Sequence, residues 1–425
     1  MQKQIFKDRF DNSYICFTHK TGLKVYVMEK PDFSSSYALF GTKYGSIDTC
    51  FSTDGKKFTS VPEGIAHFLE HKLFESEDGD AFSRYAQTGA SANAYTSFDR
   101  TCYLFSCSEK FEDNFAILLD FVQHPFFTAK TVEKEQGIIG QEIRMYDDSP
   151  SWRVLFNMLS QMYFEHPVRI DIAGTTESIA EITDTLLYEC YNTFYNPANM
   201  FICVAGNVNA DNIARMVEEN ILDKEPVNVI RGTVNEPDKV RSNYIEDKLE
   251  VSVPMFCLGF KDYCEYPQKT AKERIAMGVT LEILAGDCSE LYKELIDEQL
   301  ISDDFETEYF TGNSYAAVLF SGESENPNKV KEKIVDKINY LLENNIDSNL
   351  LNTVKCAMYG DVLRRYNSCE NMASQLAECA MFGYSLFDEQ DIIASINSED
   401  VINCLSLLKE EKSVLSIINP LKERK

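Results

Sequence analysis

Residues 64–75 read GIAHFLEHKLFE, and this stretch indicates both a fold and a chemistry. Its apolar residues recur every one to two turns, which predicts a helix. His67 and His71 are four residues apart, so both imidazoles lie on one face of that helix, one turn apart. Glu70 reaches the same side. The helix therefore offers two neutral nitrogen ligands beside a carboxylate, the combination that zinc-dependent peptide hydrolysis requires.

The spacing of these residues is that of the inverted zincin motif, H-x-x-E-H. With five histidines in 425 residues, composition alone gives on the order of 0.01 such matches, so coincidence is a small but real risk. The alternative interpretation is a helix in which the histidines are ordinary polar residues with satisfied hydrogen bonds. The position of this helix, directly after a strand and otherwise apolar, favours the metal site.

Working outward, strand and helix patterns occur in the same order in both halves of the chain. In the first half we expect strands near 14–17, 23–27, 36–44, 90–96, 101–106 and 200–205, and helices near 64–75, 110–124, 131–147, 152–164 and 178–195. In the second half we expect strands near 250–259, 304–312, 314–321 and 413–418, and helices near 268–299, 326–344, 347–366 and 370–382.

This repetition predicts the α+β class, with two repeated domains, each a mostly antiparallel sheet with helices packed on one face. Residues 1–222 form the expected N-terminal, zinc-binding catalytic domain. Residues 223–245 are polar, contain two prolines and show no sustained period, so we expect a linker there. Residues 246–425 form the expected C-terminal domain, which repeats the architecture but lacks the metal site.

Composition excludes several classes of function. The net charge of −27 repels phosphate backbones and anionic lipids, so we expect neither nucleic acid nor membrane partners. No apolar run is long enough to span a bilayer, and the N-terminus lacks the features of a secretory signal. The thirteen cysteines are scattered without a CxxC motif, which is typical of buried thiols in a reducing compartment. We therefore expect a cytoplasmic protein.

The HFLEH stretch and its surroundings resemble the pitrilysin, insulysin and mitochondrial processing peptidase family of inverted zincins. Within that family the chain resembles the short bacterial two-domain members, of the Firmicute type that is paired with a non-zinc sister protein. The resemblance implies the repeated metallohydrolase fold and Zn²⁺ as the cofactor. It also implies a third zinc ligand, a glutamate on a later helix, with a second glutamate two turns before it.

Residues 135–142, EQGIIGQE, match that later pattern. The resemblance thus makes Glu142 the third metal ligand beside His67 and His71, and makes Glu135 the residue that orients the zinc shell. A separation of seven keeps both glutamates on one helix face, as this requires. Taken alone, the pair would be typical of a solvated helix face.

Residues 89–96, GASANAYT, followed by Thr101-Cys102-Tyr103, resemble the active-site edge strand of the family. On such a strand an extended substrate is bound as an added strand, which gives affinity with little demand on its sequence. Asn93 and Ala94 are the substrate-binding positions that carry over. An ordinary edge strand is the alternative.

The expected function is a zinc-dependent metalloendopeptidase that hydrolyses short or unfolded peptides in extended form. Glu70 acts as the general base that takes a proton from the attacking water. Self-sufficient short members of the family carry an Arg and a Tyr that hold the scissile carbonyl, and Gln299 and Asp303 align with these positions. We therefore expect a homologous partner subunit, in a heterodimer, to supply the Arg/Tyr clamp. The alternative function is a non-catalytic scaffold or assembly subunit. A zinc enzyme other than a peptidase is less well supported.

Overall fold

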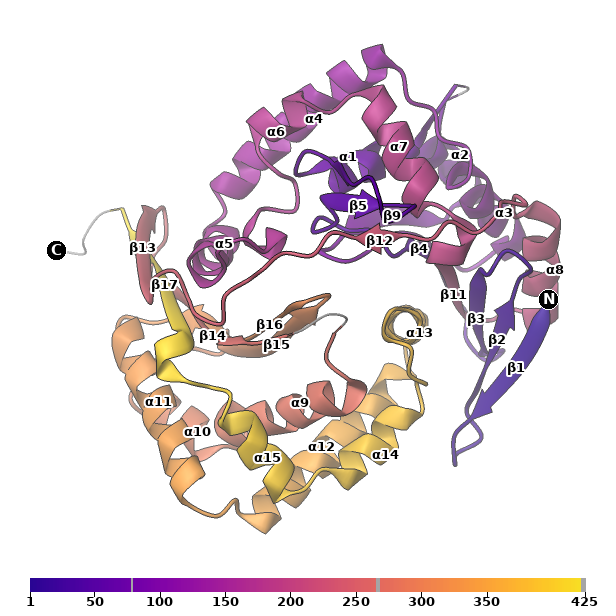
Figure 1. Ribbon diagram of the computed structural model, residues 1–425. Helices are drawn as coiled ribbons and strands as arrows, with labels where there is room; N and C mark the ends of the chain where they lie inside the picture. The colour runs from indigo at the N-terminus through magenta and orange to yellow at the C-terminus, as the bar shows by residue number, and fades with distance from the viewer. Residues whose placement is uncertain (78, 265–267, 422–425) are drawn as a thin grey trace. The chain divides into compact units, whose positions relative to one another are not determined.

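Two large sheets, each with its own helices, organise the chain in the computed structural model, which describes residues 1–77, 79–264 and 268–421 (Figure 1). The last four residues of the expected C-terminal domain, 422–425, lie outside this description. The first unit comprises residues 1–143, 171–233 and 363–388, and the second comprises 144–170, 234–362 and 389–425. Within the described residues, no helix has the length and apolar character needed to cross a membrane.

The sheet of the first unit has the strand order β1-β2-β3-β11-β4-β10-β9. All neighbouring strands pair antiparallel except β3 and β11, which are parallel. Its strands are β1 Gln2–Lys7, β2 Ser13–Thr18, β3 Lys24–Glu29, β4 Ser36–Thr42, β9 Ser91–Thr96, β10 Thr101–Cys107 and β11 Met200–Gly206. The strand β9 is therefore the last of the sheet, and among the described residues it pairs only with β10.

Helices cover both faces of the central strands in this unit. Its helices are α1 Ile65–Leu73, α2 Ala81–Thr88, α3 Phe111–Phe121, most of α4 Ala129–Asp147, α6 Thr176–Ala180, α7 Asp184–Phe194, α8 Ala210–Asn220 and α13 Cys369–Phe382. The helix α13 comes from the C-terminal half of the sequence and packs on β11, β4 and β3. Every residue of β4 and β11 is buried, as expected for strands covered on both faces.

The sheet of the second unit has the order β13-β17-β14-β16-β15, with only β13 and β17 parallel. Its elements are α5 Pro150–Met162, β13 Tyr244–Leu249, β14 Met255–Asp262, α9 Ala271–Ala285, α10 Glu290–Asp297, β15 Glu306–Gly312, β16 Tyr315–Glu323, α11 Pro327–Glu343, α12 Ser348–Arg365, α14 Asp388–Ser395, α15 Ser398–Leu405 and β17 Ser413–Pro420. Here α5, from the N-terminal half of the sequence, packs on β13, β14 and β17. At Gly259 of β14 the approach is so close that a Cβ would lie 2.6 Å from the sulfur of Met158.

The predicted fold class is confirmed: the chain is α+β, with one large, mostly antiparallel sheet in each unit. The division into units differs from a cut near residue 222, because the segments that carry α5 and α13 each join the unit of the other half. The segment with α13 covers a face of the first unit's sheet, and the segment with α5 covers a face of the second unit's sheet.

Two local expectations need correction, and the expected linker contains a short strand. The helix expected over 268–299 is two helices, because the chain breaks at Gly286 and Ser289 caps α10 by accepting from the Tyr292 N–H. The segment 223–245, the expected linker, contains a short strand, β12 at residues 230–231, that pairs with β5 (Cys50–Ser52). The strand expected from 250 begins instead at Met255, after β13.

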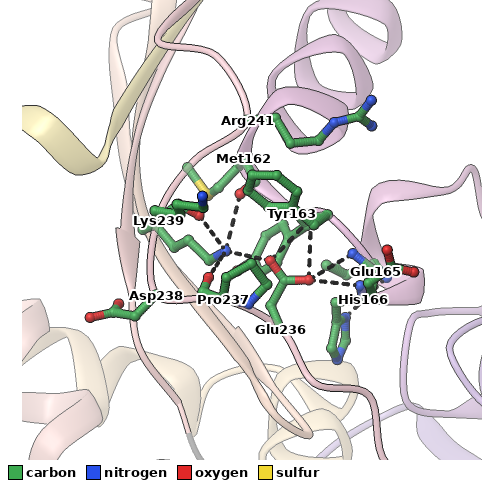
Figure 2. A network of polar contacts seen from close by, with 12 residues as sticks. Met162, Tyr163, Glu165, His166, Glu236, Pro237, Asp238, Lys239 and Arg241 are labelled. Carbon is green, nitrogen blue, oxygen red and sulfur yellow. Dashed lines mark hydrogen bonds and ion pairs between the residues drawn. The ribbon is translucent and has the colours of Figure 1, made fainter.

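A buried ion pair between Lys261 and Glu236 lies in the second unit (Figure 2). The Lys261 ammonium contacts a Glu236 carboxylate oxygen at 2.5 Å and donates to three backbone carbonyls, those of Met162, Pro237 and Lys239. Glu236 in turn accepts from the backbone N–H groups of residues 164–166. Both charges are thus fully hydrogen-bonded, the condition under which a buried pair is tolerated.

Candidate metal centre and its surroundings

The helix α1 is buried along nearly its whole length, including the polar residues His67, Glu70 and Lys72. It begins at Gly64, whose positive φ of 84° suits glycine and whose Cβ, if present, would lie 2.3 Å from the carbonyl oxygen of Ala173. The start of α1 is therefore held tightly against the loop that precedes α6. Burying polar side chains costs free energy unless they are paired, so their presence on this helix indicates a functional site.

The side chains of His67 and His71, from α1, and of Glu142, from α4, converge on one point. His71 Nε2 lies 3.4 Å from one carboxylate oxygen of Glu142, and His67 Nε2 lies 3.7 Å from the other. One ligand atom from each residue lies within 4.8 Å of the others. Two imidazole nitrogens and a carboxylate oxygen form a donor set that fits zinc, with the open fourth position typical of catalytic sites.

Glu135 contacts the other ring nitrogen of His71, the one that does not face Glu142. Its carboxylate oxygen is 3.2 Å from His71 Nδ1. A proton on Nδ1 that is donated to Glu135 leaves the lone pair of His71 Nε2 free for a metal, which is the usual tautomer of a ligating histidine. Burial alone would lower the pKa of His71, but the hydrogen bond to Glu135 and the neighbouring carboxylates raise it overall.

The electrostatics of the centre favour a bound cation. Burial lowers the pKa of His67 to about 3, so this imidazole is neutral and able to act as a ligand near neutral pH. Burial would raise the pKa of Glu135, but the hydrogen bond to His71 lowers it overall. Three carboxylates, those of Glu70, Glu135 and Glu142, lie around two imidazoles, and a divalent ion would balance this excess of negative charge.

The Glu70 side chain is hydrogen-bonded to the edge strand β9. Its Oε2 accepts a hydrogen bond of 2.6 Å from the hydroxyl of Thr96, the last residue of β9. Burial raises the pKa of Glu70, and the hydrogen bond from Thr96 opposes the rise. A carboxylate with a raised pKa binds a proton more readily, which suits a general base.

The two predicted substrate-binding residues lie in the middle of β9. Asn93 is exposed, and its side-chain oxygen accepts from the N–H of Ala94 at 2.9 Å. Ala94 is partly buried and shares its face of the strand with Thr96, two residues on. The assignment of Asn93 and Ala94 to substrate binding stays a prediction.

Sequence reasoning included Thr96 and Thr101 in the edge-strand stretch but gave neither residue a role. The signal was present, because a hairpin over 91–106 that turns at 97–100 must pair these two residues. The aligned clamp positions belong to the second unit. Gln299 follows α10 with a positive φ of 57°, and Asp303 is exposed in the turn before β15.

Comparison with protein families places the chain in a class. The model described as "Insulinase (Peptidase family M16)" matches residues 59–176, and the model described as "Peptidase M16 inactive domain" matches residues 181–358. The chain belongs to peptidase family M16, as the resemblance in its sequence implies.

Particular relatives are similar over almost the full length. A protein named "Uncharacterized zinc protease YmfH", from Bacillus subtilis (strain 168), is 41% identical over 414 residues, which cover 95% of this chain and 94% of the relative. A second protein of that strain, "Uncharacterized zinc protease YmxG", is 25% identical and covers 88% of this chain and 93% of the relative. The crystal structure of a putative M16-like peptidase from Alicyclobacillus acidocaldarius superposes with a TM-score of 0.92 at 34% identity, covering 99% of both chains. Pitrilysin, at 16% identity and a TM-score of 0.76 over 47% of its chain, shares the fold.

Proposed function

We propose that this chain is a zinc-dependent metalloendopeptidase that hydrolyses peptide bonds of short or unfolded peptides bound in extended form. The observation that carries the proposal is the convergence of His67, His71 and Glu142, with Glu70 one residue before the second histidine. Relatives of similar length that are named zinc proteases support the metal and the reaction class.

Each side chain then has a role. His67, His71 and Glu142 hold the ion, and Glu135 fixes the His71 ring. Zinc in this position supplies a Lewis acid that polarises water and the substrate carbonyl. Glu70 takes a proton from the attacking water and later gives one to the leaving amine. The position of β9 at the edge of its sheet suits an extended peptide, because backbone pairing to an edge strand binds chains of varied sequence.

We further propose that a homologous partner subunit completes the site. Gln299 and Asp303, at the aligned clamp positions, provide neither a cation nor a phenol for the substrate carbonyl. Two relatives from one Bacillus strain show that such chains occur together in a single organism, which is consistent with a paired subunit.

The test is cleavage of a quenched fluorescent, unstructured peptide by the purified chain, alone and mixed with its co-purifying homologue. We expect chelator-sensitive cleavage that zinc restores. Glu70→Gln should keep its zinc and lose almost all turnover, whereas Glu133→Gln, at an exposed position on α4, should behave as wild type. The absence of cleavage both from the chain and from the pair would instead support the non-catalytic scaffold.

A further inference from the structure

A row of threonines crosses three neighbouring strands of the first unit and ends at Glu70. Thr96 of β9 pairs directly with Thr101 of β10, and Thr101 pairs directly with Thr42 of β4. Thr42 and Thr101 are completely buried, and Thr96 is partly buried. Buried hydroxyl groups need hydrogen-bond partners, so the partners of this row determine what it does.

The hydrogen-bond partners of Thr101 and Thr96 indicate where each hydroxyl proton points. The Thr101 hydroxyl donates to the backbone carbonyl of Tyr44 at 2.9 Å. The Thr96 hydroxyl lies 3.3 Å from the Thr101 oxygen and 2.6 Å from Glu70 Oε2. A hydroxyl has one proton to donate. Because a carboxylate is the stronger acceptor, the proton of Thr96 belongs to the short bond with Glu70.

Building on the function proposed above, we propose that Thr96 is a positioning residue for Glu70. Its hydroxyl engages Oε2 and so leaves proton transfer to Oε1. The proton of the attacking water moves to Oε1 as the water oxygen bonds to the substrate carbonyl carbon. The same proton then moves from Oε1 to the nitrogen of the leaving amine as the peptide bond breaks. Thr96 donates to Oε2 throughout, so it neither gains nor loses a proton.

The position of Thr96 on β9 explains why this residue is suited to the task. A glutamate side chain has several rotatable bonds, and catalysis suffers when a reacting group is misplaced by even about 1 Å. The bond from Thr96 ties Glu70 to the very strand on which the proposed substrate is laid. The backbone position of Thr96 is set by its pairing with Thr101 of β10, whose own hydroxyl donates to the Tyr44 carbonyl.

The experiment compares Thr96→Val, which keeps the branched shape but removes the hydroxyl, with Thr96→Ser, which keeps the hydroxyl. The matched control is Thr307→Val, at a partly buried position on β15, the edge strand of the other sheet. For Thr96→Val we expect kcat to fall about 10- to 100-fold, the effect of removing a hydrogen bond to a charged group. KM should change less than about threefold, with unchanged zinc content, and Thr96→Ser should recover most of kcat.

A second readout does not depend on turnover. In a crystal structure of the Thr96→Val variant we expect the Glu70 carboxyl group to leave its wild-type orientation or to occupy more than one. An unchanged Glu70 orientation, an unchanged kcat, or a loss that Thr96→Ser does not recover would each overturn the role of Thr96. If the wild-type chain and its pair cleave nothing, the proposed function fails, and the orientation of Glu70 still decides whether Thr96 positions it.

Discussion

Removal of the Glu236 carboxylate is expected to destabilise the second unit strongly. The Lys261 side chain is almost fully buried, and among the described residues Glu236 is the carboxylate that pairs with it, at 2.5 Å. The substitution Glu236→Ala therefore strands a buried ammonium with only carbonyl partners, and it also removes the acceptor for three backbone N–H groups. Breaking a buried pair on one side costs about 3–5 kcal/mol, so we expect a loss of that size in the free energy of unfolding.

The assay is urea unfolding followed by circular dichroism, with a more exposed neighbouring pair as the control. Asp238 and Lys412 form an ion pair at 2.5 Å, but Asp238 is about half exposed, so Asp238→Asn should cost less than about 1 kcal/mol. The double variant Glu236→Ala/Lys261→Met should recover part of the loss, because the uncompensated charge is gone. A Glu236→Ala variant as stable as Asp238→Asn would refute this reasoning.

Three further predictions address the metal shell, the pH dependence of stability and the exchanged helix. Glu135→Gln should weaken zinc binding about 10- to 100-fold in a competition assay with a chelating dye, whereas Glu133→Gln should not; equal affinities would remove Glu135 from the metal shell. Burial lowers the pKa of His166 from 6.5 to about 4, and its Nδ1 accepts from a backbone N–H. The contribution of neutral His166 to the free energy of unfolding is therefore complete above pH 6.5 and falls as the pH drops toward 4. Between pH 7 and pH 4.5 we expect this contribution to fall by about 2.5 kcal/mol. Urea unfolding of His166→Asn should lack that part of the acid loss, and an unchanged pH profile would contradict the assignment. A fragment of residues 1–233 lacks α13 and should aggregate, because the face of β4 and β11 that α13 covers is exposed. The same fragment fused to residues 363–388 should give a cooperative thermal transition. A well-folded 1–233 fragment would show that α13 is dispensable.

Much of the candidate metal centre could be predicted from sequence because its geometry is local. The i, i+4 spacing of His67 and His71 determines their relative position on any helix, and the spacing of seven does the same for Glu135 and Glu142. That the two pairs face each other is a tertiary fact, and only the family resemblance anticipated it. The hydroxyl bond from Thr96 to Glu70 depends on how α1 packs against β9, which no periodicity encodes.

The fold shows the same division between local and tertiary information. Strand and helix types followed from periodicity, but the exchange of α5 and α13 between units did not, because an amphipathic helix does not specify which sheet it covers. The break between α9 and α10 was missed because apolar residues continue on both sides of it, although Gly286 and the Ser289 cap mark the place. The strand β13 was not predicted, because its first two residues fell in the expected linker and three consecutive charged residues, 246–248, interrupt its apolar pattern.

The most direct test of the account is anomalous X-ray diffraction at the zinc edge from crystals of the zinc-loaded chain. We expect one zinc ion bound by His67 Nε2, His71 Nε2 and the Glu142 carboxylate, with that peak absent from His71→Ala. A zinc-loaded crystal with no metal at these three side chains, or with zinc bound only elsewhere, would contradict the central claim.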